Sequence, residues 1–205
     1  MSNLDRALAE ISAIRGQMAR ASEFRGYGPA TFAITGLLAL IAALGQALWL
    51  KDPAGHVGTW LGLWVCVAAV SAAIIGFEMV TRSRRIHSDL ADAMIRTAVE
   101  QFLPSAAAGG LMTAVLAWVA PQSLPLLPGL WQITFSLGVF ASCRFLPRRL
   151  ALVGAWYLGS GLLAVALSGG RLAYSPWVMG LGFGIGQLLV AVFLQQGLGA
   201  DDDQR

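Results

Sequence analysis

A run of alternating charges between residues 78 and 100 holds the side chains best suited to ionic recognition. At about 100° per residue they fall within an arc of roughly 80° on one helical face, spaced for i,i+4 pairs. The run consists of Glu78, Arg82, Arg85, Asp89, Asp92, Arg96 and Glu100, and the six from Arg82 to Glu100 are the predicted partner-binding residues. The stripe is either the solvated face of an interfacial helix or a polar seam that binds another helix or a protein.

Two ionisable residues fall inside apolar segments of the chain. Glu78 and Arg144 each lie about one helical turn from the end of an apolar run, at matching depth. Near the membrane edge a long arginine side chain can reach the headgroups, so each charge can be solvated separately. The alternative is an intramembrane ion pair between Glu78 and Arg144 that joins the second and fourth predicted helices.

Glycines recur on alternate positions near the C-terminal end of the chain. Gly180, Gly182, Gly184 and Gly186 precede Gln187 in an apolar segment. Close helix packing explains such spacing, and a ligand that approaches bare backbone beside Gln187 is the alternative. The predicted weakly polar cavity is lined by Gln132, Tyr157, Gly182, Gly186 and Gln187. A dinucleotide site is excluded because no strand precedes these glycines.

Reactive side chains are few. Cys66 and Cys143 lie at different depths of the predicted threading, which predicts free thiols. His56 and His87 fall on opposite sides of the membrane, so they cannot hold one metal or haem together. We therefore predict no catalytic residues, no metal site and no cofactor, and the sequence favours a non-enzymatic protein.

The composition places these residues in a lipid bilayer. The chain has 205 residues, of which 57% are hydrophobic and only 12% are charged. Soluble domains average about 25% charged residues. Apolar runs cover residues 31–50, 58–80, 102–120, 126–145, 150–167 and 177–198, and a run of about 20 residues spans the hydrocarbon core as a helix. The predicted fold class is an all-α, polytopic transmembrane helical bundle with six transmembrane helices.

The basic residues predict how the chain is threaded. All lysines and arginines except Lys51 and Arg171 fall on one side if the N-terminus and C-terminus are both cytoplasmic. Residues 1–28 are predicted to form a cytoplasmic amphipathic helix, because apolar residues recur there at spacings of three and four. Residues 29–198 form the six-helix membrane domain, in which 81–101 is a charged cytoplasmic helical extension between the second and third helices. Residues 199–205 are an acidic flexible tail.

Several segments resemble a group of small, uncharacterised six-helix inner-membrane proteins from proteobacteria. They are EFRGYGPAT at 23–31, residues 78–94, QFLP at 101–104, LPGLWQ at 127–132 and SPW at 175–177. No activity is attached to that group. The resemblance therefore implies only a multi-pass protein of the bacterial inner membrane.

Two functions remain open on these grounds. The first is a binding, regulatory or assembly module that uses its cytoplasmic face to bind a protein partner or a second copy in a homo-oligomer. The alternative is a small-solute or ion transporter or channel that uses the weakly polar cavity. The expected surroundings are the lipid bilayer, and nucleic acid is not an expected partner because the basic residues suit anionic headgroups.

The threading predicts which loops a membrane-impermeant thiol reagent reaches in intact cells. The test uses single cysteines in 51–57, 121–125 or 168–176, in a background with Cys66 and Cys143 replaced by alanine. Each should be labelled from outside, because the threading puts these loops outside the cytoplasm. Labelling of any of them only after the membrane is opened would contradict the predicted orientation.

Overall fold

The computed structural model describes residues 28–86, 91–143, 149–170 and 172–202, and these residues form helices without any strand. In chain order the helices are α2 (Pro29–Trp49), α3 (Val57–Ile86), α4 (Ala91–Val119), the 3-10 helix η1 (Pro121–Leu126), α5 (Leu127–Ser142), α6 (Leu150–Ala166) and α7 (Pro176–Asp202). The predicted N-terminal amphipathic helix lies outside the described residues. Every predicted apolar run coincides with one α-helix, and α7 continues to Asp202 beyond the predicted start of the tail at residue 199.

Most of the helices are long enough to cross a membrane. Five have the length and hydropathy of a membrane span, within Pro29–Trp49, Val57–Arg82, Val99–Val119, Pro121–Ser142 and Pro176–Gln196. The sixth, α6, is apolar but has 17 residues, a rise of about 25 Å. The protein is therefore an all-helical, multi-pass membrane protein with five clear spans and one shorter apolar helix.

Prolines mark the beginnings of several helices. Pro29, Pro121 and Pro176 occupy the first positions of α2, η1 and α7, and Pro128 follows directly after the start of α5. A proline at this position loses no hydrogen bond, because the first backbone N–H groups of a helix have no partner within it.

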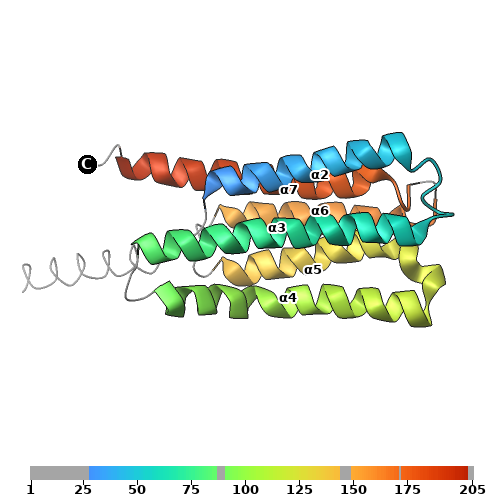
Figure 1. The fold of residues 1–205 in the computed structure, drawn as a ribbon, viewed down its shortest axis with the longest axis horizontal. Helices are drawn as coiled ribbons and strands as arrows, with labels where there is room; N and C mark the ends of the chain where they lie inside the picture. Colours follow the sequence, from blue (N-terminus) through green and yellow to red (C-terminus); the bar gives the residue numbers. More distant parts are fainter. Residues whose placement is uncertain (1–27, 87–90, 144–148, 171, 203–205) are drawn as a thin grey trace, which may run out of the picture.

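The helices run alternately up and down in one bundle (Figure 1). Each helix packs against the next along the chain, and α7 packs against α2, so that the last helix meets the first described one. The α2–α3, α4–α5 and α6–α7 connections lie at one end, which we call the loop end. The opposite end, where α3 ends and α4 begins, we call the charged end.

Glycines allow two pairs of helices to approach very closely. A methyl group added at Gly36 on α2 would lie 2.9 Å from the carbonyl oxygen of Gly184 on α7. One added at Gly129 on α5 would lie 2.5 Å from the carbonyl oxygen of Gly161 on α6. Backbones come this near only where side chains are absent, which is how small residues drive helix association in membranes.

The α3 and α4 helices are much less covered by the rest of the protein. Only 11% of the apolar window of α3 and 6% of that of α4 are buried, compared with 39% for α2 and 44% for α7. Methyl groups added at Gly62 and Gly76 on α3, or at Gly110 on α4, would meet nothing within 4 Å. These two helices therefore present most of their surface to whatever surrounds the protein.

The covered face of Gly129 and the open face of Gly110 predict different effects of the same substitution. Gly129→Ala should lower the thermal stability of the detergent-solubilised protein by about 1–3 kcal/mol, because the added methyl group would overlap α6. The matched change Gly110→Ala should leave stability unchanged or raise it, because its methyl group meets open space. Equal losses at both positions would contradict the close α5–α6 packing.

Candidate functional site

The charged stripe is divided between two helices instead of forming one continuous face. Its first part, including Glu78 and Arg82, lies on α3, and its last part, including Arg96 and Glu100, lies on α4. Because α3 and α4 run in opposite directions (Figure 1), these residues do not lie on one helical face as predicted.

The described part of the stripe on α4 is an exposed ion pair. The Nε atom of Arg96 donates to Oε1 of Glu100 at 2.6 Å, and their side chains are 80% and 59% exposed. The hydrogen bond and the charge of Glu100 raise the pKa of Arg96. Exposed i,i+4 pairs add little to stability, so this pair is available for contacts outside the protomer. Asp89 and the side chains of Arg85 and Asp92 lie outside the described residues.

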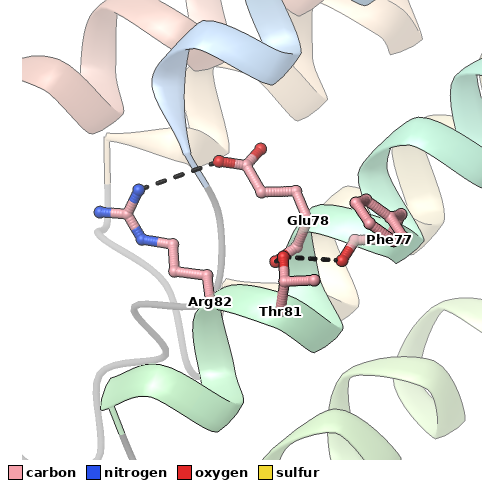
Figure 2. A network of polar contacts seen from close by, with 4 residues as sticks. All are labelled: Phe77, Glu78, Thr81 and Arg82. Atoms are coloured by element: carbon pink, nitrogen blue, oxygen red, sulfur yellow. Dashed lines mark hydrogen bonds and ion pairs between the residues drawn. The ribbon is translucent and has the colours of Figure 1, made fainter.

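Glu78 lies where α3 passes the beginning of α2. Its carboxylate touches Gly28, which precedes α2, and its Oε1 is 3.9 Å from a guanidinium nitrogen of Arg82 (Figure 2). No side chain caps the first turn of α2 by a hydrogen bond. A carboxylate at a helix N-terminus stabilises the helix through the dipole, so Glu78 ties α3 to α2. Arg144 lies outside the described residues, and the Glu78–Arg144 pair stays a prediction.

A shallow groove of about 450 Å³ lies beside Glu78, between α2 and α3. Thr31 of α2 and residues of α3 line it: Ala73, Ile74, Phe77, Glu78 and Thr81. The Thr81 hydroxyl donates to the carbonyl oxygens of Phe77 and Glu78, so its proton is not free for a ligand in the groove (Figure 2). The groove is therefore mainly apolar.

Four of the five residues predicted to line an intramembrane cavity pack in pairs, whereas Gln187 lies beside Gly36 of α2. Gln132 on α5 is fully buried, covers the face of Gly182 and donates through Nε2 to the carbonyl oxygen of Val178 at 3.0 Å. Tyr157 on α6 covers the face of Gly186 in the same way.

Large side chains therefore occupy the space beside Gly182 and Gly186, which favours close packing over a bound ligand at these glycines. The Tyr157 hydroxyl donates to the carbonyl oxygen of Phe183 at 3.4 Å, and Trp156 donates to that of Gly182 at 2.9 Å. The Oε1 atoms of Gln132 and Gln187 accept no hydrogen bond from the described residues.

A buried polar network near the loop end was not predicted from the sequence. Gln46 on α2 donates to the carbonyl oxygen of Tyr174 at 2.8 Å and accepts from Nε1 of Trp64 on α3 at 2.8 Å. One amide thus joins two helices and the α6–α7 connection. Gln46 lies within an apolar segment of the sequence, and this position could have indicated the network because a buried glutamine needs hydrogen-bond partners in the bundle.

The reactive residues form no catalytic or metal-binding group among those described. Cys66 and Cys143 are free thiols, as predicted. Within the described ranges no three His, Cys, Asp or Glu side chains lie close enough together to hold a metal ion.

The position of Glu78 predicts its contribution to stability. Glu78→Gln should lower the free energy of unfolding in detergent by about 0.3–2 kcal/mol, because the negative charge at the start of α2 is lost. Glu100→Gln, in the exposed pair, should change it by less than about 0.5 kcal/mol.

Arg144 was predicted either to reach the lipid headgroups or to pair with Glu78. Thermal unfolding of Glu78→Gln, Arg144→Gln and the double variant decides between these two roles. Additive losses are expected if Glu78 acts on Arg82 and α2 alone. A double variant clearly more stable than the sum of the single losses would establish the Glu78–Arg144 ion pair.

Comparison with known proteins finds no protein-family model, no curated protein and no solved structure that matches this chain. Its function must therefore be inferred from its own residues.

Proposed function

We propose that this chain is a non-enzymatic protein of a bacterial inner membrane that binds a protein partner, or a second copy of itself, through the cytoplasmic ends of α3 and α4. The orientation rests on the distribution of arginines, which places the charged end in the cytoplasm. The inner-membrane setting rests on the resemblance of its segments to small proteobacterial membrane proteins.

One observation carries this proposal. The two helices that the protomer covers least, α3 and α4, also carry exposed ionic side chains at their adjoining ends. Arg84 is exposed on α3, and Arg96 and Glu100 are exposed on α4. A partner can therefore contact the charges and the apolar helix faces at the same time.

The energetics of the charges support recognition as their role. Exposed ion pairs contribute a median of about 0–1 kcal/mol to stability, so the fold does not depend on them. Across an interface the same charges select a complementary partner, because like charges placed together oppose binding. Alternating signs also set the register in which a partner can align.

The transport alternative has less support. Tyr157 and Gln132 fill the glycine faces on which an intramembrane solute site would depend. The Oε1 atoms of Gln132 and Gln187 are buried within the packed bundle. Anionic lipid headgroups remain expected neighbours of the arginines, and nucleic acid does not.

Charge reversal should separate recognition from solvation. Arg96→Glu should dissociate a homo-oligomer or release a stoichiometric partner, measured as the mass of the particle purified in nanodiscs, because it places a like charge against the partner. The double change Arg96→Glu with Glu100→Arg is the matched control for folding, since it restores the intrahelical pair in reversed order.

The outcome of that control decides the interpretation. The double variant should stay as stable as the wild type, within about 0.5 kcal/mol, and still lack the partner. Higher salt should weaken the wild-type complex if the charges lie at the rim of the interface. Unchanged particle mass in both variants would overturn the proposal.

A further inference from the structure

A second recess lies at the loop end of the bundle, away from the charged end. Its volume is about 650 Å³, within the range of about 300–1,000 Å³ typical of small-molecule sites. All three connections at that end contribute to it: Asp52, Pro53 and Ala54 from the first, Gln122, Ser123, Pro125 and Leu126 from η1, and Ser168, Gly169, Gly170, Ala173 and Tyr174 from the third. We call it the loop pocket.

One charged side chain, the carboxylate of Asp52, stands among the described residues of the loop pocket. Its Oδ1 accepts a hydrogen bond from the backbone N–H of Gly55 at 3.0 Å, which fixes the turn that presents the carboxylate. An ionised carboxylate can accept about four hydrogen bonds, so this contact leaves capacity for a ligand.

Tyr174, which also lines the loop pocket, is held in place by contacts within the bundle. The Tyr174 carbonyl oxygen accepts from Gln46, and the Tyr174 ring meets Trp60 edge-on with centroids 5.2 Å apart. Trp60 is fully buried and stacks on Trp131 at 5.9 Å. Desolvation raises the pKa of Tyr174, so its hydroxyl stays neutral at physiological pH. Tyr174 is therefore a fixed and uncharged part of the lining.

We propose that the loop pocket binds a small organic cation, with its ammonium group beside Asp52 and its apolar body against Tyr174 and Leu126. The Asp52 carboxylate favours a cation by charge, and the apolar lining residues suit its apolar body. The hydroxyls of Ser123 and Ser168 and the amide of Gln122 add neutral hydrogen-bonding groups at the same site. An anionic ligand would find no arginine, lysine or histidine among the described lining residues.

Calorimetric titration of the full-length protein in nanodiscs tests this site. The probes are benzylammonium and tetraethylammonium, with benzyl alcohol as the neutral counterpart of the first and empty nanodiscs as the control for partition into lipid. Both cations should bind saturably and benzyl alcohol should not, because the pocket offers one negative charge. Binding should also change the tryptophan fluorescence, since Trp60 contacts the pocket wall.

Two variants assign the binding to the pocket. Asp52→Asn keeps an oxygen that can accept from Gly55 but removes the charge, and it should weaken cation binding about tenfold or more. Asp202→Asn removes a carboxylate at the other end of the molecule, where α7 ends, and should leave binding unchanged. Absence of saturable binding by both cations up to about 10 mM, equal binding of benzyl alcohol, or unchanged affinity in Asp52→Asn would each overturn the proposal.

Discussion

The close approach of α7 to its neighbours is the constraint on which the rest of the bundle depends. Alternate glycines give α7 two bare faces, one toward α2 and one toward α5 and α6. Gly180 and Gly184 face α2, whereas Gly182 and Gly186 are covered by Gln132 and Tyr157. In a bilayer no hydrophobic force draws apolar helices together, so tight packing and interhelical hydrogen bonds must do so.

This packing divides the molecule into a tightly joined part and an open part. The α2, α5, α6 and α7 helices bury the polar side chains of the membrane interior, where an unsatisfied polar group is costly. The α3 and α4 helices are covered less by the rest of the protein. Trp60 and Trp64 anchor α3 at the loop end, Glu78 links it to α2 at the charged end, and α4 packs on α5. The closely packed helices α2, α5, α6 and α7 stabilise the fold, and the exposed faces of α3 and α4 can bind a partner.

The sequence predicted the helices well because hydropathy and proline positions act locally. It also predicted free thiols and glycine-mediated packing. It failed where the outcome depends on which helices touch. The stripe from 78 to 100 was placed on one helical face, and the side chains that cover Gly182 and Gly186 were not identified. The Gln46 network and the loop pocket were missed for the same reason, since each joins segments far apart in the chain.

Photo-crosslinking in native membranes tests most directly whether α3 and α4 form the binding side. A photoreactive residue at Val70 or Val115, on these helices, should crosslink to a protein partner or a second copy. The same residue at Ile41 on α2 or Leu162 on α6 should crosslink only to lipid, although all four side chains are 42–66% exposed in the protomer. Equal protein crosslinking from all four positions, or none from Val70 and Val115, would contradict this account.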